Sequence, residues 1–344
     1  MRVLLGMSGG FDSSYAAHKL AAKGYRVEGA VLVMHPHTDV EAARSAAERL
    51  GIPFHVIDCK ELFERKVIST FISEYKMGRT PNPCIVCNPE VKFKCLYDYA
   101  MEHGFDYIAT GHYARVGKAI SDGVERYTLE PPADSAKDQS YMLSRLPQYI
   151  LERVLFPLAD EVKTELRSAV KEQSLPIEDK QDSQEICFIP NGGYSDFLER
   201  YLGAPTEGNF ISETGEVLGR HRGITKYTVG QRRGLGISLG KRMFVGSIDP
   251  KNNTVTLLEE GKLVLEITLS SLNFVSVSEP SAVETLDGAV KIRYQAPKVE
   301  AKVTLYPGKK ARISFVEPVK SPAPGQTAVI YSAGGNIIAS GFIE

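Results

Sequence analysis

The segment 8–14, Ser-Gly-Gly-Phe-Asp-Ser-Ser, constrains the fold of this chain more than any other feature. It follows the apolar run at 3–5 and opens into an alanine-rich stretch, a pattern that predicts a strand, a tight loop and a helix. Two adjacent glycines let a backbone come close to an anion, on which the N–H groups of the loop and the helix start converge. No Gly-Lys-Ser/Thr follows, so this is not the phosphate loop of kinases and GTPases. The alternative is an ordinary Gly-Ser turn.

The composition is typical of a soluble globular protein with two or three domains, since 43% of the 344 residues are hydrophobic and 24% are charged. No apolar run approaches the roughly 20 residues that a membrane span needs. The N-terminus enters its first expected strand within two residues, which leaves no room for a signal peptide. Five cysteines, an odd number, do not form a secreted disulfide framework. We therefore expect a cytoplasmic protein in a reducing compartment.

The first half of the chain alternates short apolar runs with helical patterns. This alternation predicts an α/β fold with a parallel sheet covered on both faces, whose ligands bind beyond the carboxyl ends of the strands. Thr38 and Glu41 form a capping-box pattern, and Gly24 and Gly51 stand where the first two helices should end. We expect strands at 2–6, 26–33, 54–58 and 106–110, and helices at about 13–23, 39–50, 61–77 and 90–103.

The sequence pattern changes past residue 200, where glycine and proline separate short strand-like stretches. Stretches at hairpin spacing close to the C-terminus predict a small all-β barrel or sandwich. A basic, glycine-rich module of about sixty residues precedes it. We therefore expect a catalytic domain at 1–200, a basic module at 201–265 and an all-β domain at 266–344. The C-terminal stretches lie at 254–258, 289–294, 300–306, 310–316, 326–331 and 336–343.

The basic module concentrates positive charge that the chain as a whole does not show. The net charge is −1, which gives no global sign of a nucleic-acid partner. A local basic patch can nevertheless bind phosphates, although a solvated basic face remains the alternative. Between residues 217 and 245 there is no acid, and the basic residues are Arg220, Arg222, Lys226, Arg232, Arg233, Lys241 and Arg242.

A second informative segment is 81–88, Pro-Asn-Pro-Cys-Ile-Val-Cys-Asn. Its prolines stiffen the backbone, and Cys87 lies just before the expected start of a helix, where a helix N-terminus would lower the pKa of its thiol. Three interpretations of Cys84 and Cys87 remain open. They could be half of a zinc or iron–sulfur site, a redox pair, or two small buried residues. A metal would need further ligands. Cys95 lies inside an expected helix, and no second Cys-x-x-Cys occurs.

Taken with Cys187-Phe188-Ile189, the glycine loop and the cysteine segment resemble the tRNA-specific 2-thiouridylases. These are ATP pyrophosphatases of the PP-loop superfamily that place sulfur on C2 of the wobble uridine of tRNA. The resemblance covers almost the whole chain, and the order of its motifs makes it very specific. Cys59 and Cys95 fall outside the motifs and are taken as structural. The matching segments also include 109–113, 137–141, 230–236, 293–294 and 324–326.

The resemblance implies a role for each matching residue. Cys87 would be the nucleophile and Cys187 would carry a persulfide, with no metal bound by the protein. ATP would lie against Gly6, Met7, Ser8, Gly9, Gly10, Phe11, Asp12, Ser13, Leu32 and Gly111. The target base would face Asn82, Pro83 and Cys84, and other parts of the tRNA would meet His112, Lys137, Asp138, Gln139, Arg293, Tyr294 and Gln326.

The implied chemistry activates a poor leaving group. Transfer of AMP to the C2 oxygen lets that oxygen leave, and ATP cleavage calls for Mg²⁺. A sulfur-donor protein would load Cys187, and attack by Cys87 would release the sulfur and form a Cys87–Cys187 disulfide. The two cysteines are a hundred residues apart, so we expect the loop at 182–190 to move when tRNA binds.

The chain also departs from the family pattern. Phe11 stands where a valine is usual, and Cys84 stands where some relatives have an aspartate, so its role stays open. Two other classes remain: a cluster-dependent tRNA thiolase, which would be coloured, and a non-catalytic tRNA-binding paralogue. Another ATP pyrophosphatase, such as an amidotransferase-linked synthetase, is disfavoured because no glutaminase motif is present.

Overall fold

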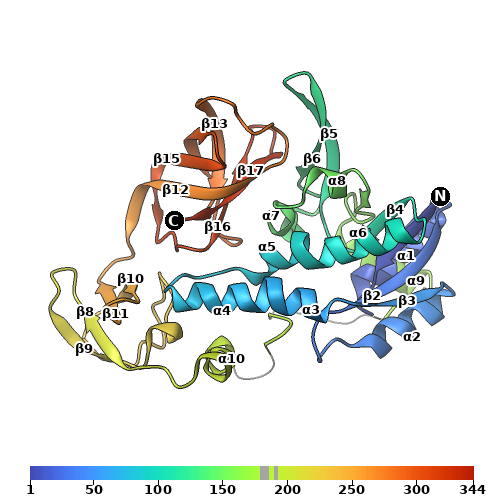
Figure 1. Ribbon diagram of the computed structural model, residues 1–344. Coiled ribbons are helices and arrows are strands. Elements are labelled where there is room, and N and C mark those ends of the chain that lie inside the picture. The colour runs from blue at the N-terminus through green and yellow to red at the C-terminus, as the bar shows by residue number, and fades with distance from the viewer. Residues whose placement is uncertain (179–185, 190–192) are drawn as a thin grey trace.

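The computed structural model describes residues 1–178, 186–189 and 193–344 of the chain. Within these ranges it contains a parallel sheet, a two-stranded hairpin, a four-stranded sheet and a closed barrel (Figure 1). The expected α/β fold is confirmed, and the C-terminal domain is a barrel rather than a sandwich. No helix in the described ranges is both long and apolar enough to cross a membrane.

The parallel sheet has the strand order β3-β2-β1-β4-β7. The chain moves outward from β1 to β3 and then continues on the other side of β1 with β4, so the strand order reverses between β1 and β4. Val3 and Leu5 pack into one apolar core and Leu4 into another, which shows that both faces are covered. The strands are β1 (Arg2–Gly6), β2 (Arg26–Val33), β3 (Phe54–Asp58), β4 (Tyr107–Thr110) and β7 (Val154–Leu155).

The first three helices begin within two residues of their expected positions, but the fourth, expected at about 90–103, begins at Pro83. Two of them are composite: α3 continues through the π-helical η1 into α4, and α5 continues through the π-helical η2 into α6. The helices are α1 (Phe11–Ala22), α2 (Val40–Leu50), α3 (Lys60–Phe63), η1 (Glu64–Ile68), α4 (Ser69–Lys76), α5 (Pro83–Cys87), η2 (Asn88–Lys92), α6 (Phe93–Glu102), α7 (Ser140–Leu143), α8 (Gln148–Leu151), α9 (Lys163–Glu172) and α10 (Gly193–Leu202), with 3₁₀ turns η3 (Ser135–Lys137) and η4 (Ile224–Lys226).

The predicted capping box before α2 is wrong by one residue. Asp39 is the N-cap, because its Oδ1 accepts from the Ala42 N–H at 2.9 Å. The Thr38 hydroxyl instead accepts from the N–H of His35. The predicted helix ends are confirmed, since Gly24 and Gly51 adopt left-handed φ values of 82° and 66°.

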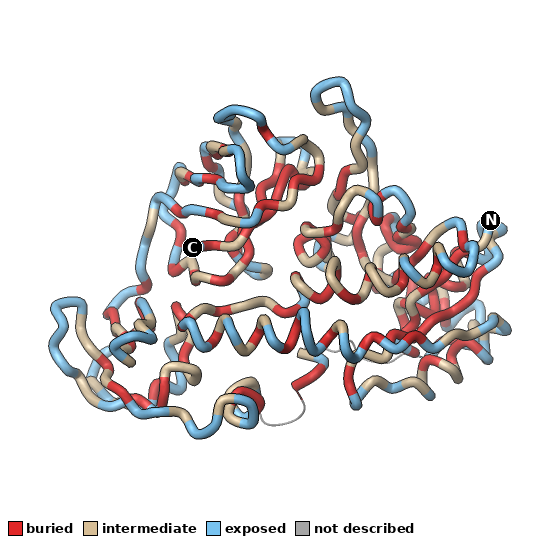
Figure 2. The backbone as a smooth tube through the Cα atoms, in the orientation of Figure 1, coloured by how far each residue is buried: buried red, intermediate tan, exposed pale blue. Residues whose placement is uncertain are grey.

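The rest of the chain is mainly β structure. The hairpin of β5 (Arg115–Ser121) and β6 (Val124–Glu130) projects from the catalytic half, and its tip is exposed (Figure 2). The four-stranded sheet, of order β10-β11-β8-β9, lies within the basic module and contains β8 (Gly208–Ile211), β9 (Val217–His221), β10 (Phe244–Asp249) and β11 (Thr254–Leu258).

The barrel closes in the order β12-β15-β14-β13-β16-β17 around its own apolar core. In Figure 1 it lies above α4, while the four-stranded sheet lies at the far end of the molecule from the parallel sheet. Its strands are β12 (Leu263–Phe274), β13 (Glu284–Lys291), β14 (Val299–Tyr306), β15 (Lys310–Lys320), β16 (Thr327–Tyr331) and β17 (Ile337–Ile343).

Candidate nucleotide and thiol site

The glycine loop connects β1 to α1 at the carboxyl edge of the parallel sheet. Gly9 has a φ of 73°, and a Cβ there would lie 2.5 Å from the carbonyl carbon of Ala42. The loop is therefore pressed against the first turn of α2, which only glycine permits. Within the loop, the Ser13 hydroxyl donates to the Gly10 carbonyl at 3.1 Å, and the Gly10 N–H donates to the Ser8 hydroxyl at 3.4 Å.

Gly111, which follows β4, packs against the same loop. A Cβ on Gly111 would lie 2.8 Å from the backbone nitrogen of Ser13, so this position also needs glycine. Leu32 is buried near the carboxyl end of the adjacent strand β2. The fold thus gathers the predicted ATP residues where the strand order reverses, which is where such sheets bind ligands. Phe11 is buried and stacks on Tyr15, so its ring fills the core.

Lys163 is a residue at this site that the sequence reasoning missed. Its ammonium group donates to Asp12 at 2.8 Å, and the Tyr113 hydroxyl donates to the other oxygen of the same carboxylate at 3.0 Å. The Lys163 side chain is only 4% exposed. The buried Lys163 ammonium is thus paired with a carboxylate in the first turn of α1, directly after the glycine loop. The available signal was its spacing, because Lys163 shares the buried face of α9 with Leu166 and Val170.

Three thiols gather beyond the carboxyl end of β2. The Cys87 thiol lies 3.8 Å from the sulfur of Met34, the residue that follows this strand. Cys84 and Cys87 both belong to α5, and burial mainly raises the pKa of Cys87, with smaller increases from the charges of Cys187 and Cys84. Cys187 is held there by its neighbour Phe188, whose buried ring contacts aromatic rings on α3, α4 and α10.

The cysteines are all free thiols in this structure. The predicted disulfide between Cys87 and Cys187 is therefore not formed here, although the fold has already brought the two residues to one region. The loop motion expected at 182–190 falls mostly on 182–185 and 190, outside the described residues.

The prediction that a helix N-terminus lowers the pKa of the Cys87 thiol is wrong. The helix begins at Pro83 with Asn82 as its N-cap, so Cys87 is the last residue of α5 and Cys84 is in its first turn. Burial of Cys87 raises the pKa of its thiol to about 12, an effect that Lys92 partly offsets through its charge and its backbone N–H. Burial also raises the pKa of the Cys187 thiol, although Cys187 reaches the surface.

His112 lies between Gly111 of the nucleotide site and the aromatic core. Its Nδ1 hydrogen-bonds with the Thr110 hydroxyl at 2.7 Å. Burial, together with the positive charge of Lys92, lowers the pKa of His112 to about 3. The imidazole is therefore neutral at physiological pH, which suits a hydrogen-bonding role rather than a cationic one.

Apart from His112, the residues predicted to contact RNA fall into two groups. Asn82, Pro83 and Cys84 start α5 beside the thiols, and the Asn82 carboxamide accepts from the Cys84 N–H at 3.1 Å. The other group lies where the catalytic half meets the barrel, since the Tyr294 hydroxyl donates to the Asp138 carbonyl at 3.2 Å.

Some of these predicted RNA contacts already serve the fold. The Gln139 carboxamide oxygen accepts from the Tyr113 N–H at 2.9 Å, and the Gln326 amide donates to the Thr80 carbonyl at 2.8 Å. Lys137 is half-buried and Arg293 is exposed.

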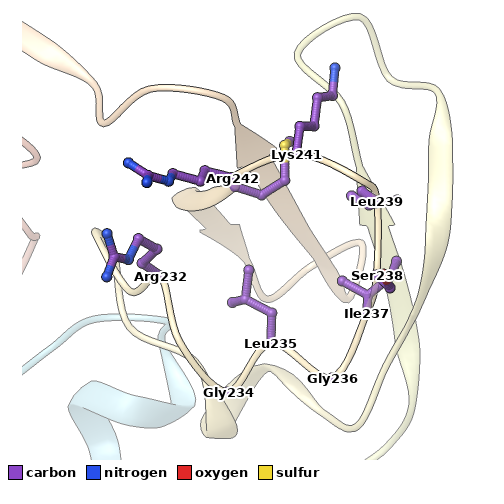
Figure 3. Close-up of a pocket in the computed structure, with 10 residues that line it drawn as sticks. Arg232, Gly234, Leu235, Gly236, Ile237, Ser238, Leu239, Lys241 and Arg242 are labelled. Atoms are coloured by element: carbon purple, nitrogen blue, oxygen red, sulfur yellow. The ribbon is translucent and has the colours of Figure 1, made fainter.

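The basic module presents an open cavity of about 490 Å³ between residues 232 and 243. Figure 3 shows the side chains of Arg232 and Arg242 on one side of this loop, with Lys241 directed away from them. Lys241 pairs with Glu259, and Lys226 pairs with Glu199 at 2.7 Å. Arg222, Arg232, Arg233 and Arg242 are exposed.

The remaining cysteines form a separate pair. Cys59 is buried, Cys95 is half-buried, and a hydrogen bond between them raises the pKa of Cys59. Across residues 1–178, 186–189 and 193–344, no group of three or more His, Cys, Asp and Glu side chains is arranged to hold a metal ion.

Three family models match the chain in succession. They are described as the tRNA methyl transferase HUP domain over residues 1–191, the tRNA methyl transferase PRC-barrel domain over 195–259 and the aminomethyltransferase beta-barrel domain over 264–343. The first model covers more than half of the chain, so the catalytic half is a HUP domain, the class of fold that the parallel sheet and its glycine loop define.

Curated relatives identify the family within this class. The tRNA-specific 2-thiouridylase MnmA of Acetivibrio thermocellus is 42% identical over 100% of this chain and 99% of its own length. The corresponding protein of Treponema denticola is 40% identical over 100% and 98%. The chain belongs to the tRNA-specific 2-thiouridylase family.

A solved 4-thiouridine synthetase–RNA complex with bound ATP also matches. It is 20% identical over 58% of this chain and 50% of that chain, with a TM-score of 0.34.

Proposed function

We propose that this protein is an ATP-dependent tRNA-uridine 2-sulfurtransferase that converts the wobble uridine to 2-thiouridine, releasing AMP and pyrophosphate. The observation that best supports this function is that the glycine loop and the Cys87 thiol lie at the same edge of the sheet. The glycine loop follows β1, and the Cys87 thiol lies 3.8 Å from Met34, which follows the neighbouring strand β2. A base activated at the loop is therefore close to the thiols. The full-length relatives carry the name of this activity.

The nucleotide site fits the triphosphate of ATP. Gly9 and Gly111 let the loop pack closely against α2 and against the end of β4, and the backbone N–H groups at the start of α1 would bind phosphate oxygens. Lys163 adds a cation beside Asp12. Mg²⁺ is part of the proposal, since it would offset phosphate charge as pyrophosphate leaves, and Asp12 is a carboxylate within the 8–14 segment that could hold it. The loop, with Leu32 and Gly111, would orient ATP so that its α-phosphate faces the C2 oxygen of the base.

The thiols supply the second half of the reaction. A sulfur-donor protein loads Cys187 as a persulfide, Cys–S–SH. The Cys87 thiolate attacks the Cys187 sulfur, a Cys87–Cys187 disulfide forms and HS⁻ leaves. This hydrosulfide adds to C2, and AMP departs with the original oxygen. A dithiol reductant then restores both thiols. The high pKa of Cys87 in the free protein fits a nucleophile that is ionised only after the substrate complex changes its surroundings.

We assign catalysis to residues 1–200 and tRNA binding mainly to 201–265 and 266–344. Asn82, Pro83 and Cys84 face the target base, and Arg293 and Tyr294 reach the tRNA from the barrel side of the seam. Lys137, Asp138 and Gln139 complete this proposed set, with His112 and Gln326 nearby. The free thiols suit a reducing cytoplasm, where such a reaction would take place.

The test is direct synthesis of the modified base. The protein is incubated with ATP, Mg²⁺, a persulfide donor and unmodified tRNA, and 2-thiouridine is measured by nucleoside mass spectrometry. We expect Cys87→Ala and Cys187→Ala each to abolish product, whereas the control Cys95→Ala retains it. Product that persists in Cys187→Ala would overturn the persulfide assignment, and no product from the unchanged protein would overturn the function.

A further inference from the structure

The connection between α4 and α5, residues 77–82, is called the proline loop here. It leads directly into Cys84 and Cys87, so its position sets where α5 begins. Its middle residue, Thr80, is buried, which means that the polar groups of its backbone need partners within the protein.

Both of those partners come from the C-terminal barrel rather than from the catalytic half. The Thr80 N–H donates to the Pro324 carbonyl at 2.7 Å, and the Gln326 side-chain amide donates to the Thr80 carbonyl at 2.8 Å. These contacts join residues about 245 positions apart in the sequence. Together they bind both the N–H and the carbonyl of Thr80.

The barrel segment that makes these contacts is itself firmly fixed. The Gly325 N–H donates to the Ile343 carbonyl at 2.9 Å, and the Ile343 N–H donates to the Gln326 carbonyl at 2.8 Å. Gly325 has a φ of 87°, and a Cβ there would lie 3.1 Å from the Thr80 nitrogen and 2.9 Å from the Glu74 carboxylate. The glycine thus allows the barrel backbone to lie directly on the proline loop.

The ends of the proline loop are held as well. At one end, a Cβ on Gly78 would lie 2.9 Å from the Ile248 side chain of the basic module, so this module also touches the loop. At the other end, the Asn82 amide donates to the Met142 sulfur at 3.6 Å, and its oxygen caps α5. The centre of the loop is therefore the part that depends on the barrel.

We propose that Gln326 is a positioning residue: through Thr80 it fixes the proline loop, and with it the placement of Asn82 and Cys84, relative to the nucleotide site. The barrel then has a role in forming the active site besides any contact with RNA. The consequence for catalysis rests on the proposed function, but the structural claim does not.

The experiment compares Gln326→Ala and Gln326→Glu with the unchanged full-length protein. Gln326→Glu keeps the size of the side chain but removes the donor, so it serves if Gln326→Ala fails to fold. The control is Gln295→Ala, which alters an exposed carboxamide on the same barrel. Hydrogen exchange of peptides covering residues 77–84 is measured without any substrate, and steady-state kinetics of 2-thiouridine formation are measured with unmodified tRNA.

We expect exchange at 77–84 to become about tenfold faster in both Gln326 variants and to stay unchanged in the control. The kcat should fall about tenfold, while KM for tRNA stays within about twofold. Unchanged exchange together with a raised KM and normal kcat would overturn the proposal and make Gln326 a direct RNA contact. If the unchanged protein makes no 2-thiouridine, the proposed function fails, yet the exchange measurement still decides whether Gln326 fixes the loop.

Discussion

Single residues at this site show how burial changes the chemistry that a motif predicts. Cys87 has the motif of a reactive thiol, but the buried end of α5 raises its pKa to about 12. Lys163 shows the opposite case, since no motif marked it and yet it is buried in an ion pair with Asp12, next to the glycine loop. For Cys87 the charge state follows mainly from desolvation, which Lys92 partly offsets.

The Cys87 thiol should remain protonated and unreactive in the free protein. At pH 8 we expect iodoacetamide to alkylate it at least about tenfold more slowly in the native state than in urea, because the thiolate is the nucleophile. Because burial disfavours the thiolate, this thiol leaves the stability of the fold unchanged below its ordinary pKa of 9.0, and stability falls as pH rises from 9.0 to about 12. Site-resolved mass spectrometry and urea unfolding at several pH values measure both effects. Equal alkylation rates in the two states would contradict the assignment.

Removing the Lys163 charge should weaken the ATP-dependent step. We expect Lys163→Met to lower the rate of pyrophosphate release about 10²-fold, as loss of a preorganised cation does at other sites of developing charge. The matched control is Lys171→Met, because Lys171 is exposed on the same helix. A pyrophosphate assay with unmodified tRNA measures both variants. Equal activity of the two would remove Lys163 from the site.

At the scale of elements, the site depends on how closely the loop and the helices approach. The glycine loop has α2 packed on one side and Gly111 on the other, with separations that leave no room for a Cβ. The composite helix from α5 through η2 to α6 places Cys87 next to a π-helical turn, a feature often found at functional sites.

Gly9 should tolerate no side chain, for a reason beyond its φ angle. We expect Gly9→Ala to lower the free energy of unfolding by ~3 kcal/mol or more and to raise KM for ATP, because its Cβ meets the backbone of α2. Gly24 has a similar φ of 82° but nothing within 4 Å of its Cβ position, so Gly24→Ala isolates the backbone cost of ~1 kcal/mol. Urea unfolding compares them. Similar losses would show that contact with α2 is unimportant.

At the scale of the whole molecule, the barrel is joined to the catalytic half by side chains that satisfy backbone groups. The Arg126 guanidinium on β6 donates to the carbonyls of Phe274 and Val275 at 3.1 and 3.0 Å, and the Asn273 amide donates to the Ser144 carbonyl at 3.0 Å. Such contacts hold the barrel in a fixed orientation, which the proposed role of Gln326 requires.

Binding of tRNA should involve the basic module through its charge. We expect Arg232→Gln combined with Arg242→Gln to reduce the salt dependence of tRNA binding, lowering the slope of log Kd against log salt by about 1 to 2. The control is Lys23→Gln, which removes the charge of an exposed lysine outside the basic module, directly after α1. Titrations of unmodified tRNA at several KCl concentrations measure the slope. An unchanged slope would show that these arginines do not meet phosphates.

The sequence alone determined the local elements and the motifs. The strands at 2–6, 26–33 and 54–58, the loop between the first strand and its helix, and the ends of the helices at Gly24 and Gly51 follow from local periodicity and turn chemistry. These features depend on neighbours a few residues away, which a linear pattern contains.

Only the tertiary structure decided what depends on distant partners. It placed Lys163 against Asp12 and Thr80 against Gln326, and it buried Cys87. Local spacing in the sequence predicts neither these two contacts nor the burial of Cys87. Charge state and position are fixed by packing between segments far apart in the chain, because desolvation and hydrogen-bond partners arise only when those segments meet.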